Sequence, residues 1–399
     1  MQKKRNLFFH TGTHKTGTTA IQRFLKANRK TFERKGFGIA GLNTSERAQI
    51  KQIAKTIGTN QKNNKAITQY DPITDSIARC QNKSDKKLHS FIISWEGFSG
   101  NSRNGYLDAG HYAKFIAQYN QNFRVKSITF FRRQDDFIES MYTQNVKHGY
   151  SESFDYYLEN IEIGGFSWLS MAKNYEEELG RDNVIIARYG KEYFQDETSI
   201  LKQFVEHLGL IPDEFNLAAT NKPFVISNPG WPRHVVEATR ELNSKIPPHQ
   251  RPQYIRAINS LMHKKSNKDY TYLEEAHRKA LALRFHNSNL ILARERFGEQ
   301  SLELFKGEVD LTKKQIKPLQ RNDEYNLDRD ALLGLILEMA LNLEGDNNIL
   351  IKSAHNIQNR QIKLIEPMHK LIKIILRPFK TLRATNHARR VNPNDKKSC

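Results

Sequence analysis

The chain has 399 residues, 38% of them apolar and 27% charged, and carries a formal net charge of +20. These proportions are typical of a globular protein and exclude a disordered or membrane-embedded chain. The basic excess indicates an anionic partner without identifying it. The two cysteines, Cys80 and Cys399, fit neither a disulfide framework nor a zinc site. Because the apolar run 331–337 is far shorter than a bilayer span and the N-terminus lacks a signal-peptide core, we expect a cytoplasmic protein.

Strand-like and helix-like segments alternate through the first half of the chain. Buried strands are expected over 7–10, 36–40, 90–94, 127–131 and 183–188, and helices over about 135–147, 168–179 and 198–208. A further helix is expected directly after Gly17, because Ile21, Phe24 and Leu25 recur on one face. This alternation predicts an α/β fold in which a mostly parallel sheet is covered by helices on both faces.

The second half of the chain shows helical patterns in place of strands. Helices are expected over 232–245, 253–263, 272–296 and 328–343. We therefore expect an α/β domain over 1–245, with a polar insertion or lid over 43–88, followed by a mostly helical C-terminal extension over 246–359. A basic amphipathic tail is expected over 360–399, which contains eleven Lys or Arg residues and two acidic residues.

The segment Gly12-Thr13-His14-Lys15-Thr16-Gly17-Thr18-Thr19 has the glycine spacing of a phosphate-binding loop. In the nucleotide-triphosphate loop the lysine follows the second glycine, whereas here Thr18 holds that position and Lys15 precedes Gly17. A loop between a strand and a helix directs backbone N–H groups and the helix dipole at one anion. Since Lys15 lies within the loop, its ammonium can reach a group bonded to the held phosphate. The loop therefore predicts a phosphate with one further anionic group, bound without a metal.

The run from His10 to Thr19 resembles the 5′-phosphosulfate-binding loop of sulfotransferases that use 3′-phosphoadenosine 5′-phosphosulfate (PAPS). It is especially similar to the H-x-G-x-x-K-T-G-T-T loop of their bacterial, carbohydrate-type branch. The resemblance implies a three-layer, P-loop-like parallel sheet. It assigns Lys15 to charge stabilisation near the bridging oxygen of the phosphosulfate. The residues that it assigns to cofactor binding in this loop are Lys15, Thr16, Gly17, Thr18 and Thr19.

A second motif follows the strand expected over 127–131. Arg132, Asp136 and Ser140 keep the spacing of the 3′-phosphate site of the same family. An arginine at the end of a strand can direct two N–H groups at one phosphate. The resemblance assigns Arg132 and Ser140 to this role. Two features depart from it or leave it open: Gln134 replaces the usual proline or alanine, and Arg133 is a second candidate arginine.

The catalytic base is less strongly indicated. Sulfuryl transfer needs a group that takes the proton of the acceptor hydroxyl. Glu96 follows the strand over 90–94 and is our first candidate, with a capping or ion-paired glutamate as the structural alternative. His14, which can donate to a phosphate oxygen, and His10, which is more typical of a packed strand end, rank below it.

Together the motifs predict an enzyme that moves a sulfuryl group from PAPS to an acceptor hydroxyl by in-line transfer without a metal. The resemblance implies a saccharide acceptor, either a polysaccharide or a glycolipid. A P-loop nucleotide kinase is one alternative, although its lysine and Mg²⁺-binding aspartate are missing. The other is a basic membrane- or nucleic-acid-associated binding protein. The tail 360–399 suits anionic lipid at the inner face of the membrane, whereas no motif indicates nucleic acid.

Overall fold

The computed structural model describes residues 4–59, 71–161, 163–194, 196, 198–218, 231, 233–245, 247–249, 251, 252, 255, 258 and 271–313. These residues belong to two compact units. The first contains the described residues up to 144, from 153 to 218 and from 271 to 313. The second contains 145–152 and the described residues between 231 and 258.

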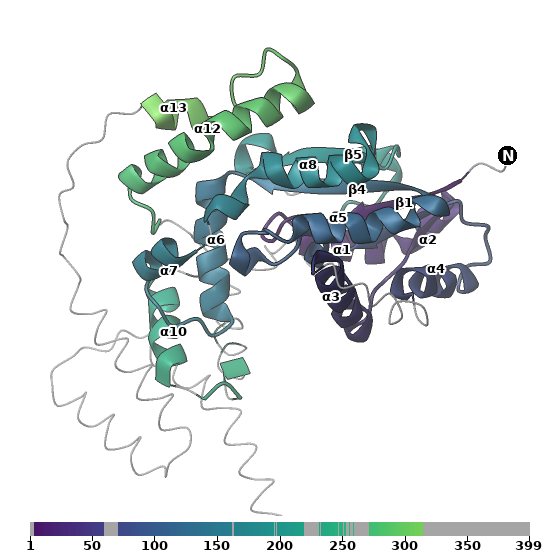
Figure 1. The fold of residues 1–399 in the computed structure, drawn as a ribbon. Helices are drawn as coiled ribbons and strands as arrows, with labels where there is room; N and C mark the ends of the chain where they lie inside the picture. Colours follow the sequence, from purple (N-terminus) through teal and green to yellow (C-terminus); the bar gives the residue numbers. More distant parts are fainter. Residues whose placement is uncertain are drawn as a thin grey trace, which may run out of the picture. The chain divides into compact units, whose positions relative to one another are not determined.

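The first unit is built on a five-stranded sheet with the order β2-β3-β1-β4-β5 (Figure 1). Its strands are β1 (Arg5–His10), β2 (Phe37–Ile39), β3 (Ser90–Ser94), β4 (Phe123–Arg132) and β5 (Val184–Tyr189). All four pairs of neighbouring strands are parallel. The carboxyl ends of all five strands therefore lie along one edge of the sheet, which we call the carboxyl edge. Ligands of open parallel sheets bind outside this edge.

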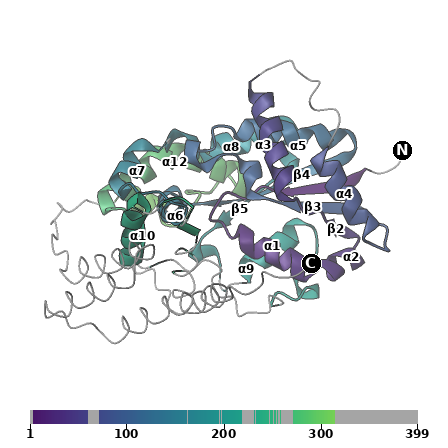
Figure 2. The same cartoon turned by 90° about the horizontal axis from the view of Figure 1, so that it is seen from below.

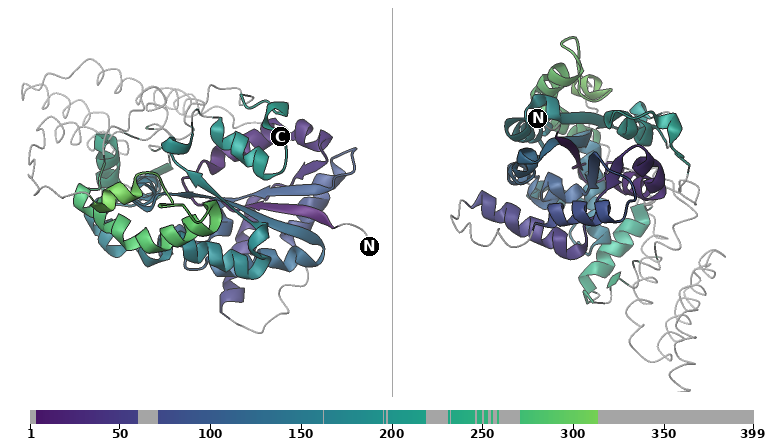
Figure 3. Two further views of the ribbon diagram at one scale, coloured as in Figure 1. Left: turned by 90° about the horizontal axis from the view of Figure 1, so that it is seen from above. Right: turned by 90° about the vertical axis from the view of Figure 1, so that its right-hand side faces the viewer.

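Helices cover both faces of the sheet (Figures 2 and 3). One face carries α1 (Thr18–Ala27), α2 (Arg29–Arg34) and α9 (Ser199–His207), and the other carries α3 (Thr44–Gly58), α5 (Ala109–Ala117) and α8 (Trp168–Leu179). The strands are buried on both faces; for example, Leu7 and Phe9 of β1 point one way and Phe8 the other, and all are buried. The α/β fold with a parallel sheet between two helical layers, expected from the sequence, is confirmed.

The polar segment expected to form an insertion or lid contains two capped helices. The side chain of Asn43 accepts a hydrogen bond from the Glu46 N–H, and the Glu46 carboxylate accepts one from the Asn43 N–H, so α3 begins with a capping box. The Asp71 side chain caps α4 (Pro72–Asn82) by accepting hydrogen bonds from the Ile73 and Thr74 N–H groups, and a proline occupies the first position of the helix. Both helices bury apolar residues, such as Ile50 of α3. A lid function for this segment stays a prediction.

The remaining α-helices of the first unit are α6 (Gln134–Lys147, whose last three residues belong to the second unit), α7 (Phe154–Asn160), α12 (Glu275–Phe297) and α13 (Glu308–Lys313). The second unit contains α10 (Arg233–Lys245). Short 3-10 helices are η2 (Glu96–Ser99), η3 (Ser102–Asn104), η4 (Gln118–Gln121), η5 (Ile163–Phe166), η6 (Arg181–Asn183), η7 (Lys191–Tyr193) and η8 (Pro212–Glu214). Within the described ranges, no helix is both long and apolar enough to cross a bilayer.

The C-terminal helices divide differently from the expected boundary at residue 245. Residues 271–313, with α12 and α13, group with the sheet, whereas α10 belongs to the second unit. In that unit the buried side chain of Asn243 donates hydrogen bonds to the carbonyls of Val146 (2.7 Å) and Tyr150 (2.9 Å). The helix expected over 328–343 and the basic tail over 360–399 lie outside the described residues, as does most of the helix expected over 253–263.

Candidate functional site

The loop that follows β1 is held against the end of β4. The Thr11 N–H donates to the Ile128 carbonyl (3.0 Å), and the Thr13 hydroxyl donates to the Phe130 carbonyl (3.0 Å). The hydroxyls of Thr11 and Thr129 are 2.5 Å apart. These threonines continue the pairing of β1 with β4 beyond the strand itself. The phosphate-binding loop predicted from the sequence is therefore fixed beside the strand that ends at Arg132.

Helix α1 begins with unsatisfied hydrogen-bond donors. Gly17 precedes the helix with a φ of 75°, which favours glycine, and no side chain caps the helix. Among the described residues, none accepts a hydrogen bond from the N–H groups of residues 16–19, and the first turn contains no acidic side chain. The Thr18 hydroxyl oxygen is buried without a described partner. A buried hydroxyl without a partner costs free energy, which an anionic ligand at this helix end would recover.

Lys15 has a strained backbone and reaches across to α6. Its φ is 65°, a left-handed conformation that costs a residue with a side chain about 1–2 kcal/mol. Its ammonium donates to the Gln144 side-chain oxygen over 3.4 Å. Gln144 lies one helical turn after Ser140 on α6. The lysine of the first motif is therefore brought to the helix that carries the serine of the second.

The two consecutive arginines at the end of β4 have different surroundings. Arg133 forms two hydrogen bonds with Asp135, from Nε (2.7 Å) and Nη2 (3.1 Å). The Arg132 guanidinium forms no ion pair with any described residue and lies 5.9 Å from the ring centre of Tyr189. Arg133 already has a carboxylate partner, so Arg132 is the arginine with donors to offer a ligand.

Tyr189 at the end of β5 connects the two motifs. It pairs with Arg132 in the register of β4 and β5. A Cβ atom placed on Gly17 would lie only 3.2 Å from the Tyr189 ring. Gly17 and Arg132 therefore share one neighbour, and both lie at the carboxyl edge. This position was missed in the sequence analysis, although a polar aromatic residue at the last position of a parallel strand is a usable signal.

Ser140 is buried on α6, two turns after Arg132 along the chain. Its hydroxyl forms no hydrogen bond with the described residues, whereas its backbone carbonyl accepts one from Thr143 (3.0 Å). The hydroxyl is thus not engaged by the described part of the chain. This is compatible with the ligand-binding role expected from the spacing of the second motif.

Glu96 opens the 3-10 helix η2 directly after β3 and Trp95. Its carboxylate accepts a hydrogen bond from the Gln22 side chain (3.2 Å), which also donates to the Ser94 carbonyl (3.3 Å). Gln22 lies one turn into α1, the helix whose N-terminus faces the loop. The candidate base is therefore held by an amide at the carboxyl edge, next to the helix of the first motif, and forms no ion pair with any described residue.

His14 of the loop is paired with Tyr106, a residue that the sequence analysis missed. The Tyr106 oxygen accepts a hydrogen bond from the His14 N–H (3.0 Å) and is 2.9 Å from His14 Nδ1. Nδ1 is the one described acceptor for the Tyr106 proton, which places the proton of neutral His14 on Nε2. Burial raises the pKa of Tyr106 well above its ordinary value, so the phenol stays neutral. Tyr106 also has a strained φ of 65°, and nothing in its sequence neighbourhood signals this role.

His10 has the packing role that its position at a strand end suggested. Its ring is fully buried, Nδ1 is 2.7 Å from the Ser94 hydroxyl, and burial lowers its pKa to about 3. A Cβ on Gly12 would lie 2.7 Å from its Nε2, so the first glycine of the loop makes room for this ring. The imidazole is therefore neutral and lies beneath the loop.

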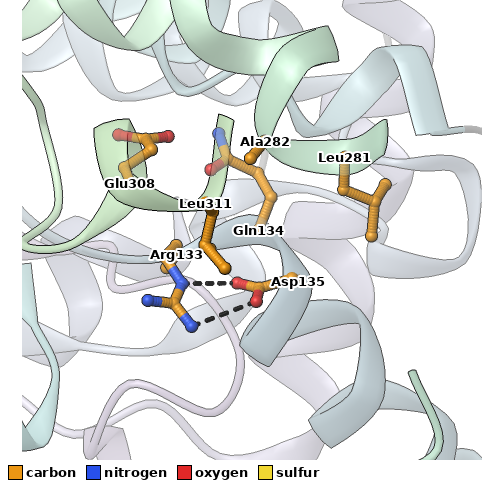
Figure 4. Close-up of a pocket in the computed structure, with 7 residues that line it drawn as sticks. All are labelled: Arg133, Gln134, Asp135, Leu281, Ala282, Glu308 and Leu311. Carbon is orange, nitrogen blue, oxygen red and sulfur yellow. Dashed lines mark hydrogen bonds and ion pairs between the residues drawn. The ribbon is translucent and has the colours of Figure 1, made fainter. Parts of the chain in front are cut away.

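Gln134, which departs from the family pattern, joins α6 to α12. Its side-chain amide exchanges two hydrogen bonds of 3.0 Å with Asn289, and the Asn289 amide also donates to Glu308. Gln134 and Glu308 line a cavity of about 10 Å³, room for about one water molecule (Figure 4). Burial raises the pKa of Glu308 to about 7. A polar residue at the start of α6 is thus matched by a polar residue on α12.

The acidic residues at the start of α6 are also bound by α12. Arg278 of α12 contacts Asp135 and donates hydrogen bonds to Asp136 (3.3 Å) and Glu139 (2.9 Å). We call this contact, together with the Gln134–Asn289–Glu308 network, the α6–α12 interface. It holds the first turns of α6, the helix that carries Ser140, against α12.

Comparisons with known proteins add little to this description. No family model matches the chain. An uncharacterized protein of Archaeoglobus fulgidus is 24% identical over 213 residues, which are 53% of this chain and 54% of that protein. The chain thus spans about half the length of this relative. The crystal structure of a sulfotransferase from Alicyclobacillus acidocaldarius aligns over 73% of this chain and 95% of its own, with 14% identity and a TM-score of 0.40. At so low a TM-score, function must be inferred from the residues of the site.

Proposed function

We propose that the protein is a sulfotransferase that moves a sulfuryl group from PAPS to a hydroxyl group of an acceptor. One observation carries the proposal: at the carboxyl ends of the neighbouring strands β1 and β4 lie two sets of hydrogen-bond donors that no described residue engages. PAPS carries a phosphosulfate at its 5′ end and a phosphate at its 3′ position. A donor with anions at both ends matches a site with two such sets.

The residues divide between the two ends of the donor. The N–H groups of residues 16–19 and the buried hydroxyl of Thr18 would hold the 5′-phosphate. Arg132 and Ser140 would hold the 3′-phosphate, the arginine through a pair of N–H groups. Lys15 and His14, in the loop between β1 and α1, would face the sulfuryl group and the bridging oxygen.

The transfer needs one proton acceptor and one site of charge neutralisation. The acceptor oxygen forms a bond to sulfur while the bond from sulfur to the bridging oxygen breaks, and the electron pair of that bond stays on the 5′-phosphate. Glu96 takes the proton of the acceptor hydroxyl. Lys15 neutralises the charge that develops on the leaving oxygen. The products are a sulfate ester, the 3′,5′-bisphosphate PAP and a protonated carboxyl group, which balances the reaction.

The acceptor class in this proposal is a saccharide, and the reaction uses no metal. Two measurements test the proposal. Because a ligand at about 100 times its Kd stabilises a protein by roughly 2.7 kcal/mol, PAP should raise the melting temperature without magnesium, and ATP with Mg²⁺ should not. Radiolabelled sulfate from PAPS should then appear on a hydroxyl-bearing acceptor from a panel of glycans, lipids and phenols. Stabilisation by ATP and Mg²⁺ but not by PAP would instead favour the P-loop kinase.

A further inference from the structure

Two basic side chains of α3 lie against one tryptophan next to the candidate base. Arg47 and Lys51 are one helical turn apart, so they lie on the same face of α3. The Arg47 guanidinium carbon is 6.0 Å from the centre of the Trp95 ring, and the Lys51 ammonium is 5.9 Å from it. Trp95 directly precedes Glu96, and its backbone N–H donates to the His10 carbonyl (3.2 Å). Both cations therefore lie beside the strand end that presents Glu96.

Neither cation has an acidic partner among the described residues. The Arg47 Nε is buried without a hydrogen-bond partner in that part of the chain. The neighbouring acid of the same helix, Glu46, is engaged elsewhere, by Arg79 of α4. Two like charges one turn apart destabilise a helix. Packing over Trp95 offsets part of this cost, but it leaves the charge of both groups uncompensated.

The order of the strands places these cations on the acceptor side of the proposed reaction. Along the carboxyl edge, Arg132 ends β4, the Lys15 loop follows β1, Glu96 follows β3, and α3 follows β2. Neighbouring strands are about 4.8 Å apart. Donor-binding groups thus occupy β4 and β1, the candidate base follows the next strand, and the two cations come from beyond it. An acceptor whose hydroxyl attacks near Glu96 can therefore extend toward α3.

We infer that Arg47 and Lys51 form a subsite for an anionic group of the acceptor, with Trp95 as its floor. The inference rests on the proposed sulfotransferase function and narrows its acceptor to an acidic saccharide. The anionic group is a carboxylate or a sulfate ester, carried by the sugar unit next to the one that is sulfated. Arg47 supplies a fork of N–H groups and Lys51 a point charge, and the buried Trp95 ring beneath them holds both side chains in place.

The chain offers a matched control on the same helix. Lys55 lies one further turn along the same face as Arg47 and Lys51 and is exposed. Lys55→Gln therefore removes the same charge from the same helix without touching Trp95. The test variants are Arg47→Gln, Lys51→Gln and the pair together. Melting temperatures with and without PAP, measured for each variant, separate loss of the fold or of donor binding from loss of the subsite.

Sulfate transfer from PAPS is measured onto a uronic-acid polysaccharide, its carboxyl-reduced form and a sulfated neutral polysaccharide. We expect each glutamine substitution at Arg47 or Lys51 to raise KM for the acidic acceptors roughly tenfold, as loss of one charged contact does, with kcat nearly unchanged. Lys55→Gln should have no such effect, and the carboxyl-reduced acceptor should bind all variants equally weakly. Preference for the carboxylate or for the sulfate ester identifies the anion.

Two outcomes would overturn the subsite. One is an equal KM for wild type and the Arg47→Gln, Lys51→Gln pair with acidic acceptors. The other is an equal loss with the carboxyl-reduced polymer, which would mean that the cations only support Trp95. If no polysaccharide is sulfated, calorimetric binding of acidic oligosaccharides still decides the matter. Binding that the paired variant loses and Lys55→Gln keeps would support the subsite while the proposed function fails.

Discussion

Arg132 and Arg133 are neighbours in sequence, yet they belong to two regions that treat charge in opposite ways. At the α6–α12 interface, Arg133 and Arg278 are matched by the carboxylates of Asp135 and Glu139. At the carboxyl edge, Arg132 has no described acidic partner, and the buried Thr18 hydroxyl has none either. Internal pairing stabilises the fold, whereas unmatched donors gathered at one edge require a ligand to match them. Within the second motif, Arg133 therefore has a structural role, and Arg132 is the candidate for ligand binding.

The largest expected effect belongs to the carboxyl edge. Lys15→Ala should lower the rate of sulfate transfer by roughly 10²–10³, since it removes one group that stabilises charge in the transition state. The free energy of unfolding should change little, because the alanine keeps the backbone and the hydrogen bond from Lys15 to Gln144 is long, at 3.4 Å. Single-turnover transfer from PAPS measures the rate, with Lys15→Arg as the variant that keeps the charge. An undiminished rate in Lys15→Ala would contradict the assigned role of the loop.

At the α6–α12 interface, we expect a pH-dependent contribution of Glu308 to the free energy of unfolding. Glu308 has its pKa raised from 4.5 to about 7, so between these values the folded protein holds a proton that the unfolded chain has lost. Its contribution therefore falls as pH rises from about 4.5 to about 7, by roughly 3 kcal/mol in all, and stays lower above. Glu308→Gln should remove this fall in urea unfolding at a series of pH values.

His10 beneath the carboxyl edge has the opposite dependence. Its pKa is lowered from 6.5 to about 3, so the unfolded chain binds a proton there that the folded protein does not. Its contribution falls as pH drops from about 6.5 to about 3. Both wild type and Glu308→Gln contain His10, so its contribution cancels when their free energies of unfolding are subtracted at each pH. A difference that does not change between pH 4.5 and 7 would show that Glu308 is ionised throughout.

Substituting the two arginines in turn tests the comparison most directly. Arg132→Ala should weaken PAP binding by about ten- to a hundredfold and leave the melting temperature of the ligand-free protein unchanged. Arg133→Ala should lower the free energy of unfolding by about 2 kcal/mol, because Asp135 is buried and loses two hydrogen bonds. Calorimetry with PAP and chemical denaturation supply the two readouts. The reverse result would exchange the roles of the two residues.

The smallest effect is expected at Tyr106. Tyr106→Phe leaves the His14 N–H without an acceptor, which should cost about 1 kcal/mol of unfolding free energy. Tyr112→Phe is the control, since that hydroxyl makes no hydrogen bond with the described residues, and it should change stability by only a few tenths. Equal losses in the two variants would mean that Tyr106 contributes packing alone.

Local patterns were sufficient to predict the elements that carry the site. Hydrophobic periodicity and the glycine residues at element ends predicted β3 and α8 at their observed bounds, and Gly17 of the loop correctly marked the start of α1. They gave β4 only in part, because its first residues alternate exposed and buried side chains and extend the strand from Phe123. The local patterns also assigned α12 to the C-terminal extension and not to the unit that contains the sheet. No local signal in α12 indicates that its Arg278 and Asn289 bind α6.

The amino-acid sequence by itself determined the parallel sheet and the position of the two motifs after β1 and β4, because strand period, glycine turns and strand-end polarity are properties of a few consecutive residues. Only the tertiary structure showed that Arg133 is paired with Asp135 while Arg132 has no described acidic partner. It also brought Tyr106 and Tyr189 to the loop and placed Arg47 and Lys51 beside Trp95. Each of these depends on contacts between residues far apart in the chain. Whether a charged side chain is paired can depend on residues that are distant in sequence, so a local sequence pattern cannot predict it.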